Sequence, residues 1–565
     1  MALDRFFEHR FRQVRTAAAA LLACSVVACT SSAPPTPQAL APTPSTARTA
    51  MLLAINDVYR IEGVEGGKQG GLARVRTLRR ELEREYPDLL VLHAGDLIYP
   101  SFASRMYNGE QMISVLDQLD GSDQRDPRIF ITFGNHEFDK RKQKDAGILA
   151  ARIAQSQFTW LGGNVTLAES DDGRPFAAPG AVERSVLVTS GGIRIGLFGL
   201  TIPTADVEYA EFAGPNETAK ALTAQLRKAG AEVVVALTHL NAADDRELLE
   251  TLGAEGPDLI VGGHDHEKMA FEVGGRWVIK ADADARTASV IKLRLDRGPV
   301  EVSYEYRSLG EGHPGSPEPD PAVQTLVDQW QARHEKEFCA GKRAPANCLE
   351  EVYGRTRTVL EAEENKIRGH ETSLGDWIAD RMLETFAHCG AQVAFLNAGT
   401  LRLNQDLAAG STITRRQVEE LFGFPAPLRL IRMNGKLLQQ TAEQSVYGWP
   451  GSGTWLQIAG WAFVHDAANK TATGLVRLTP SGALPVKPDD EILAVTGDYL
   501  VNPEIGDQDG YTFLPTEEVP GCAASGKDIK DVVIEALRAA EPQGIAPRTE
   551  GRICQGAEGP CLAGR

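Results

Sequence analysis

The feature that most constrains the fold of this chain is an alternation of short apolar runs and amphipathic stretches between residues 50 and 300. The runs are rich in Val, Ile and Leu, and they cover residues 51–55, 89–93, 129–133, 194–200, 233–237 and 258–262. Stretches with helical character, such as 71–86 and 216–229, lie between them. Alternating strands and helices are typical of an α/β domain, in which the strand tips meet at one edge of the sheet. Ligands bind beyond those tips, so the residues after each run are candidates for a site.

The residues at these tips are of a kind that binds metal ions. The side chains at these tips that offer an oxygen atom or an imidazole nitrogen are those of Asp57, Asp96, Asn135, His136, His239, His264 and His266. This mixture suits Zn, Mn or Fe better than Ca, which prefers oxygen alone. A carboxylate can bridge two ions, and two ions can hold both the attacking and the leaving oxygen of a phosphate ester. The tips together therefore predict a metal site.

Taken in chain order, the tips resemble a known family. Residues 57–59, 95–96, 134–137, 238–240 and 263–266 are similar to the ordered blocks of the calcineurin-like metallophosphoesterases, and GNHEFD at 134–139 is the form of the 5'-nucleotidase branch. Segments 395–402, 454–460 and 498–511 resemble further blocks of that branch. The resemblance covers roughly residues 50–553. It implies a four-layer α/β/β/α sandwich followed by a second α/β domain, the 5'-nucleotidase C-terminal domain.

The resemblance also implies the site and the reaction. Two divalent ions (Zn, Mn, Mg or Fe) would share Asp96 and take these ligands: Asp57, Asp96 and His266 for the first, and Asp96, Asn135, His239 and His264 for the second. His136 would stabilise charge near the phosphate or protonate the leaving oxygen, and Asp139 would orient its ring. The implied reaction removes the 5'-phosphate of a nucleoside monophosphate by attack of a hydroxide that bridges the metals.

Two tyrosines near the tips leave the first metal position open to several interpretations. The first block of the family is usually D-x-H, with the histidine as a ligand, but here Asp57 is followed by Val58 and Tyr59. The site could keep three protein ligands, a phenolate could replace the imidazole, or Tyr59 could border the site without binding metal, which we prefer. Tyr99 lies three residues after Asp96, a spacing similar to the GDxxY block of purple acid phosphatases. Ordinary packing is the alternative for both rings.

The second domain is expected to hold the nucleoside, since aromatic faces suit a base and a carboxylate suits a ribose diol. The residues that match substrate-binding positions of the family are Arg368, Asn397, Arg402, Trp455, Tyr499 and Asp509. Trp455 and Tyr499 match the stacking positions, with core packing as the alternative. UDP-sugars, 2',3'-cyclic nucleotides and sulfur esters are alternative substrates on the same scaffold. A surface nucleotide-binding protein with a degraded metal site is an alternative of another class.

The N-terminal segment predicts export. Residues 1–29 combine several arginines with a short apolar run and end at Cys29 in a VVAC sequence, which is similar to a bacterial lipobox. The alternative is ordinary signal-peptidase cleavage nearby. Residues 30–49 are rich in Pro and Thr and are expected to form a tether. We therefore expect a periplasmic or cell-surface protein that contacts the membrane through a lipid anchor at Cys29.

The remaining boundaries follow from composition and from the resemblance. We expect a metallophosphoesterase catalytic domain at 50–310, a linker at 311–354 with a helix over 323–338, a nucleotide-binding C-terminal domain at 355–553, and a tail at 554–565. The net charge of -17 argues against a nucleic-acid polymer as partner, because such a partner requires a basic face.

Six cysteines beyond the export signal suggest disulfides in an oxidising compartment. Cys339 and Cys348 are close in sequence, as are Cys554 and Cys561, so local bridges are plausible. These two bridges would leave Cys389 to pair with Cys522. Other pairings stay open from the sequence alone.

Overall fold

The computed structural model describes residues 47–122, 124–168, 176–449, 451–466, 468–506 and 508–556. The predicted signal peptide, Cys29 and almost all of the tether therefore lie outside the described residues. Within those ranges, no helix has the length and apolar character that crossing a bilayer requires. A single compact unit begins at Ala47 and contains both parts of the chain that are described below.

The N-terminal part contains two β-sheets, whereas the alternating pattern alone suggested one. The seven-stranded sheet has the order β15 (Glu301–Ser308), β14 (Thr287–Leu295), β1 (Arg48–Ile55), β2 (Leu90–His93), β3 (Ile129–Thr132), β4 (Thr159–Leu161) and β6 (Val182–Glu183). The six-stranded sheet has the order β12 (Met269–Val273), β13 (Arg276–Lys280), β11 (Leu259–Gly262), β10 (Val233–His239), β8 (Ile193–Thr201) and β7 (Ser185–Ser190). Each predicted apolar run is a strand, and the predicted tips are divided between the two sheets.

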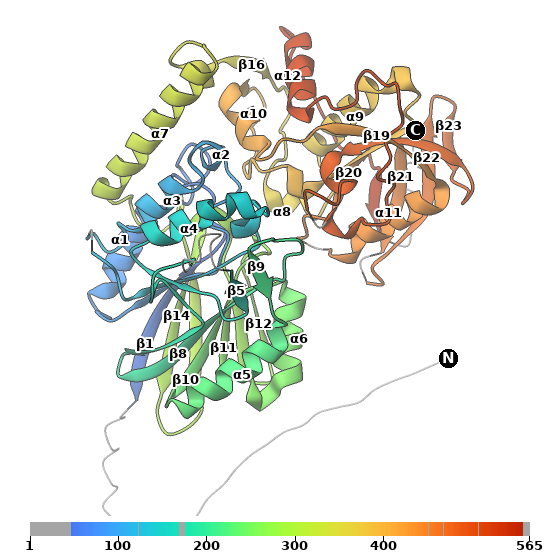
Figure 1. Cartoon of the computed structure of the whole chain (residues 1–565). Helices are drawn as coiled ribbons and strands as arrows, with labels where there is room; N and C mark the ends of the chain where they lie inside the picture. The colour runs from blue at the N-terminus through green and yellow to red at the C-terminus, as the bar shows by residue number, and fades with distance from the viewer. Residues whose placement is uncertain are drawn as a thin grey trace, which may run out of the picture. The chain divides into compact units, whose positions relative to one another are not determined.

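The two sheets pack face to face, with helices on their outer faces (Figure 1). Strand β1 shows how the sequence achieves this, because successive side chains of a strand point to opposite faces. Leu53 and Ile55 pack against the helices, while Leu52 and Ala54 pack against the second sheet. The helices over the first sheet are α1 (Leu72–Glu83), α3 (Glu110–Leu116), α4 (Ala146–Gln155) and α7 (Pro321–Gly341). Those over the second sheet are α5 (Pro215–Lys228) and α6 (Ala242–Leu252). This confirms the expected four-layer α/β/β/α sandwich.

Strand direction brings the predicted ligands together. Strands β1, β2 and β3 pair in parallel, and so do β8, β10 and β11. The carboxyl ends of neighbouring parallel strands therefore lie side by side, as in other α/β sheets. The short helix α2 (Ser104–Tyr107) and the strand pair β5 (Val165–Leu167) and β9 (Ala210–Phe212) are additions outside the two main sheets.

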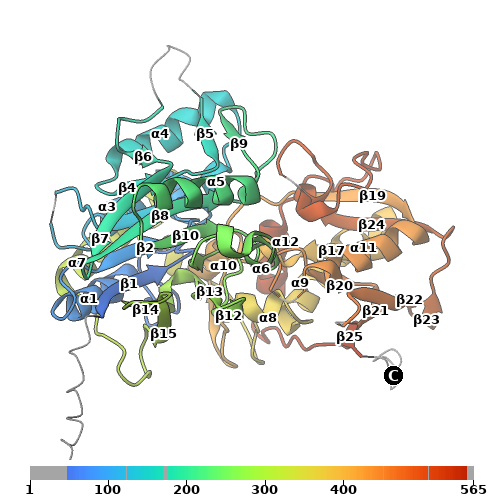
Figure 2. The same ribbon diagram turned by 90° about the horizontal axis from the view of Figure 1, so that it is seen from below.

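The C-terminal part is a separate α/β arrangement around its own core. Its main sheet has the order β19 (Leu428–Asn434), β24 (Glu491–Gly497), β17 (Val393–Asn397) and β20 (Leu456–Ala459). Helices α9 (Ser373–Thr385) and α11 (Gly435–Tyr447) pack against this sheet (Figure 2). A second sheet has the order β23 (Gly482–Pro485), β22 (Thr471–Thr479), β21 (Trp461–Asp466) and β25 (Ile553–Gln555). The remaining elements are β16 (Val352–Arg355), β18 (Thr412–Thr414), α8 (Glu364–Ile367), α10 (Arg415–Leu421) and α12 (Ile529–Ala539).

Helix α7 lies between the two parts in the chain, and its residues Pro321–Gly341 include the range 323–338 for which a helix was expected. It begins at Pro321, and the side chain of Asp320 accepts hydrogen bonds from the backbone N–H groups of Ala322 and Val323. A proline in the first turn together with an aspartate N-cap is a favoured helix start.

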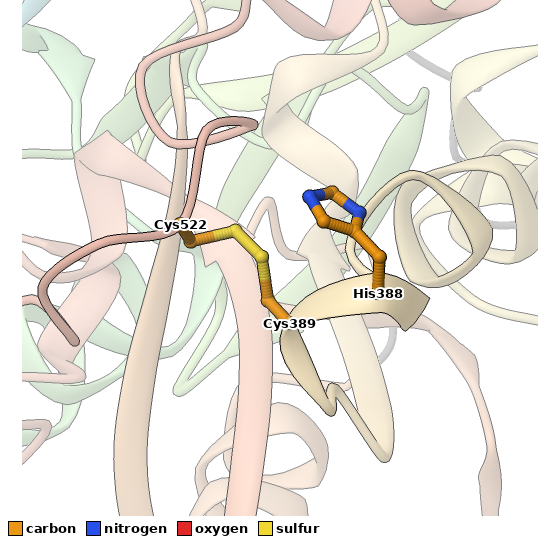
Figure 3. A group of neighbouring side chains, drawn as sticks. All are labelled: His388, Cys389 and Cys522. Atoms are coloured by element: carbon orange, nitrogen blue, oxygen red, sulfur yellow. A yellow bond between two sulfur atoms is a disulfide. The ribbon is translucent and has the colours of Figure 1, made fainter.

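Two of the suggested disulfides are present, Cys339–Cys348 and Cys389–Cys522. Cys554 is also disulfide-bonded, but its suggested partner Cys561 lies outside the described residues, so that pairing stays a prediction. His388 lies beside the Cys389–Cys522 bridge (Figure 3). Both sulfur atoms of this bridge are bonded to each other, so they offer no thiolate to a metal ion, and we do not regard this group as a metal site.

Candidate metal centre

Four of the predicted ligands have left-handed backbone. The angle φ is 50° at Asp57, 57° at Asp96, 80° at His264 and 62° at His266. Residues other than glycine rarely adopt this region. Such conformations persist where the surrounding structure holds them, and they cluster at functional sites. The chain therefore turns at the ligands themselves and not only at the glycines beside them.

Glycine is needed where two tips approach each other closely. A Cβ atom on Gly134 would lie 2.1 Å from Oδ1 of Asp96, and one on Gly263 would lie 2.3 Å from the carbonyl oxygen of Ala94. Any side chain at these positions would push the tips of neighbouring strands apart.

The predicted second metal position is a close group of donor atoms. Nε2 of His239 lies 3.3 Å from Oδ2 of Asp96 and 3.2 Å from Oδ1 of Asn135. Nδ1 of His264 lies 3.1 Å from the same Asn135 oxygen and 3.3 Å from Nε2 of His239. The structure thus brings together all four residues that the sequence assigned to this position.

The predicted first metal position is a second group, and Tyr59 points into it. Nε2 of His266 lies 3.2 Å from Oδ1 of Asp57. The Tyr59 hydroxyl lies 2.7 Å from that nitrogen, 3.0 Å from Oδ2 of Asp96 and 3.3 Å from Oδ1 of Asp57. The Tyr59 hydroxyl therefore contacts all three expected ligands, and the preferred interpretation, that it does so without binding metal, stays a prediction.

The chemistry of these donors fits a bound cation. The ring nitrogen Nδ1 of His239 lies 2.7 Å from the carbonyl oxygen of Ala94, so Nδ1 carries a proton and Nε2 of the neutral ring presents a lone pair. That lone pair faces oxygens of Asp96 and Asn135, which are also acceptors. Electron pairs that converge in this way are satisfied by a shared proton or by a metal ion. Asp57, Asp96 and His239 have ligand atoms that all lie within 4.8 Å of one another.

The electrostatics of the centre also favour a bound cation. Burial alone raises the pKa of Asp57 and Asp96, but the neighbouring histidines outweigh burial and hold both pKa values well below the usual range. Burial lowers the pKa of His239, yet Asp96 and Asp57 raise it to about 10, so these carboxylates favour a positive charge at Nε2, carried either by a proton or by a metal ion. For His264, burial and the charge of His239 lower the pKa to about 3. Two ionised carboxylates buried side by side stabilise a cation between them.

Glu137 explains how the second and third tips are held together. Its buried carboxylate accepts hydrogen bonds from the backbone N–H groups of Asp96, Leu97, Ile98 and Gly134, at distances between 2.5 and 3.0 Å. A carboxylate satisfied by four N–H groups fixes the loops that carry two of the predicted ligands.

Lys280 on β13 holds the tip that carries His264 and His266. Its Nζ donates to the carbonyl oxygens of Leu240 and Gly263 and contacts the carboxylates of Asp245 and Asp265. The lysine is 1% exposed. Burial lowers the pKa of Lys280, but the two carboxylates outweigh burial and raise it, so the lysine is charged and fully paired.

His136 and Asp139 form the expected pair beside the centre. Nδ1 of His136 lies 3.0 Å from Oδ1 of Asp139, and its Nε2 lies 3.8 Å from Oδ2 of Asp96. Burial lowers the pKa of His136, but Asp139 and Asp96 outweigh burial and raise it. Arg402 comes from the C-terminal part and places its guanidinium 3.4 Å from Nε2 of His136. A positive group from the second part thus reaches the predicted phosphate position.

The hydrogen bond of Tyr99 goes to a residue outside the predicted ligand set. Its hydroxyl donates to Oδ1 of Asn108 at 2.5 Å, and the ring is 6% exposed. The similarity to the GDxxY block therefore corresponds to a buried hydrogen bond in this chain.

Three of the predicted nucleoside-binding residues meet at one carboxylate. Asp509 accepts from the Asn397 amide at 2.8 Å and from the Tyr499 hydroxyl at 3.1 Å. Trp455, in contrast, is 1% exposed within the C-terminal core and donates from its indole to the carbonyl oxygen of His370. Its buried ring leaves no face for a base, so the core alternative describes Trp455 in this structure.

The structure suggests an aromatic residue that the sequence interpretation missed. Phe424 is half-buried, and its ring centroid lies 5.9 Å from that of His136. It stands between Gly423 and Pro425 in the connection from α10 to β19. The sequence did contain a signal for Phe424, because an aromatic residue between glycine and proline in a loop is a candidate for ligand binding.

Comparison with known proteins places this architecture in a family. Residues 51–268 match the calcineurin-like phosphoesterase domain, and residues 352–514 match the 5'-nucleotidase C-terminal domain. The chain therefore belongs to the 5'-nucleotidase family of metallophosphoesterases, which are hydrolases that act on phosphoric ester bonds with divalent metal ions.

Particular relatives agree with this assignment. The chain is similar to human 5'-nucleotidase, with 23% identity over 530 residues that cover 86% of this chain and 85% of that protein. It is also 23% identical over 525 residues to the trifunctional nucleotide phosphoesterase of Bacillus subtilis, covering 85% of this chain but only 34% of that longer protein. A solved 5'-nucleotidase precursor from Thermus thermophilus shares the fold, with a TM-score of 0.71, 21% identity, and coverage of 90% of this chain and 100% of the other.

Proposed function

We propose that this protein removes the 5'-phosphate from nucleoside monophosphates with the help of two divalent ions. The observation that carries the proposal is the position of Asp96. Its Oδ2 lies 3.3 Å from Nε2 of His239 and 3.0 Å from the Tyr59 hydroxyl, so it belongs to both donor groups. Two ions that share this carboxylate would supply an activated water nucleophile and would neutralise the charge of the phosphate.

The residues around the centre take the remaining roles. Arg402 lies where it stabilises the negative charge on the phosphate oxygens, because its guanidinium approaches His136. His136 carries a proton on Nε2 in its charged form and donates it to the leaving 5'-oxygen. Asp139 holds the ring through Nδ1 and favours the protonated form of the imidazole.

A single segment, residues 397–402, connects the phosphate end to the nucleoside end. It begins at Asn397, which is bonded to Asp509, and ends at Arg402 beside His136. We propose that Asp509 binds the ribose diol and that Tyr499 and Phe424 provide aromatic faces for the base. The relatives named 5'-nucleotidase support this choice of substrate.

The test combines metal analysis with a panel of substrates. We expect two ions per wild-type chain and phosphate release from AMP that exceeds release from UDP-glucose, 2',3'-cyclic AMP and an aryl phosphate. Asn135→Ala should lose one ion and most of its activity, whereas Asn469→Ala, in an exposed turn, should lose neither. A wild-type protein that binds no ion and hydrolyses no ester would show a binding protein with a degraded site. A preference for a sugar nucleotide, a cyclic nucleotide or a sulfur ester would reassign the substrate.

We also propose that the protein works outside the cytoplasm, tethered at Cys29. The disulfides Cys339–Cys348 and Cys389–Cys522 support an oxidising compartment. Cell fractionation tests the anchor. The wild type should be recovered with membranes and Cys29→Ser in the soluble fraction, and equal release of both proteins would contradict lipid attachment.

A further inference from the structure

The expected first-metal histidine is held by a carboxylate from the other part of the chain. His266 follows β11 in the N-terminal part, and its Nδ1 makes a short contact with Oε2 of Glu364, the first residue of α8 in the C-terminal part. Glu364 is 3% exposed. Family membership and sequence blocks assign no role to Glu364.

This contact determines which nitrogen atom of the imidazole is available to a metal ion. Because Nδ1 of His266 donates to Glu364, the lone pair of the neutral ring is on Nε2. That atom faces Oδ1 of Asp57 at 3.2 Å and the Tyr59 hydroxyl at 2.7 Å. Metal-binding histidines commonly donate their second nitrogen to a carboxylate, which fixes the tautomer and the orientation of the ring.

Glu364 is itself held in place on both sides. Its carboxylate lies 3.2 Å from the guanidinium of Arg368, and its backbone N–H donates to Oδ1 of Asn404. The Asn404 amide in turn donates to Asp284, whose carboxylate accepts from the backbone N–H of Tyr59. A continuous hydrogen-bond network therefore links Glu364 in the C-terminal part to the backbone of Tyr59 in the N-terminal part. This network fixes the carboxylate that accepts from His266.

We propose that Glu364 is a positioning residue that completes the first metal position from the C-terminal part, so that full metal affinity requires both parts of the chain to be docked. This inference rests on the proposed metal-dependent function. It also gives Arg368 a second task, because this predicted substrate residue neutralises the carboxylate that orients His266. A substitution at Glu364 should weaken metal binding, and any loss of turnover should follow from the lost metal ion.

The test measures metal affinity directly. Metal-free protein is titrated with Co²⁺ and followed by visible absorption and by competition with a chelator. We expect Glu364→Ala to weaken binding of one of the two ions between about 10- and 100-fold and to leave the other ion unchanged. Glu364→Gln keeps an acceptor without the charge, so its affinity should lie between those of the wild type and the alanine variant. Circular dichroism of the metal-free variants establishes that they are folded.

The matched control is Glu363→Gln. Glu363 is the neighbour of Glu364 and also crosses between the two parts, with Oε1 lying 3.1 Å from the guanidinium of Arg286, but it contacts no predicted ligand among the described residues. We expect wild-type Co²⁺ affinity in this control. An equal loss in Glu363→Gln, or unchanged affinity in both Glu364 variants, would overturn the inference. A wild-type protein that binds no Co²⁺ would instead overturn the proposed function.

Discussion

The hydroxyl of Tyr59 lies 2.7 Å from Nε2 of His266, inside the group of atoms expected to bind the first metal ion. The same hydroxyl contacts Asp57 and Asp96. The family's D-x-H block would have an imidazole at this position. The chain therefore keeps a polar atom at this point and changes its chemical type, and we still predict that this atom does not bind the metal ion.

We expect Tyr59→Phe to weaken binding of the first ion about tenfold, because it removes an oxygen that contacts all three expected ligands of that ion. A loss of this size is in the range of a buried polar contact. Co²⁺ titration of the metal-free protein measures this effect. Tyr99→Phe is the matched control, since that hydroxyl contacts Asn108 instead. Equal affinity in wild type and Tyr59→Phe would show that Tyr59 only packs against the site.

The pair His136 and Asp139 predicts a change in pH dependence. Burial lowers the pKa of His136 and Asp139 raises it, with a net increase. A raised pKa keeps the acid form present to higher pH, and activity is lost as pH rises through that value. Asp139→Asn removes the raising charge, so the alkaline limb of the kcat/KM profile should move to lower pH. An unchanged limb with reduced kcat would mean that Asp139 only fixes the geometry.

Arg402 should matter for every substrate with a terminal phosphate, whatever its base. We expect Arg402→Ala to lower kcat/KM for AMP by about 100-fold, as for other groups that stabilise developing charge. Arg432→Ala is the control, because that arginine is exposed on β19 and pairs with Glu491. Steady-state rates with AMP and with inorganic phosphate as inhibitor measure the effect. Normal phosphate inhibition in Arg402→Ala would place the phosphate elsewhere.

Phe424 should distinguish substrates with a base from those without one. Stacking on an aromatic ring contributes roughly 1–3 kcal/mol per base, so we expect Phe424→Ala to raise KM for AMP about tenfold. The KM for ribose 5-phosphate should stay near its wild-type value. A similar rise with both substrates would indicate that Phe424 supports His136 and not the base.

Replacing Lys280 should lower the free energy of unfolding by more than the loss of one exposed ion pair would. Lys280→Met leaves Asp245 and Asp265 without their buried counter-ion, a change that typically costs about 3–5 kcal/mol. Urea unfolding of the metal-free protein measures the loss. Lys220→Met is the control, because its pair with Glu255 is exposed and contributes little. Equal midpoints for wild type and Lys280→Met would contradict this role.

The strands and the convergence of the predicted ligands were predictable because both leave local signals. Each apolar run is a strand, and the polar residues that follow the runs converge, as the tips of parallel strands do. The presence of two sheets followed from the family resemblance and not from the pattern, because an apolar run does not reveal which sheet it joins. The left-handed backbone at Asp57 and His264 was also hidden, since tertiary contacts impose it.

The substrate residues were harder to predict, because aromatic side chains serve cores and binding sites equally well. Trp455 and Phe424 lie in similar surroundings of glycine and small residues in the sequence, yet the first is buried and the second is partly exposed. Glu364 gave no signal at all, because its partner His266 is 98 positions away in the chain and in the other part of the structure.

Because the predicted ligands are divided between two sheets, the packed interior of the N-terminal part sets the distance between them. Asp57 and Asp96 extend from one sheet, and His239 and His264 from the other. The side chains between the sheets, such as those of Leu92 and Leu237, keep the sheets about 10 Å apart. A methylene gained or lost in this layer would change the distance between the predicted ligands of the two sheets. The geometry of the proposed metal site is therefore set in part by the hydrophobic core, at residues that contact none of the predicted ligands.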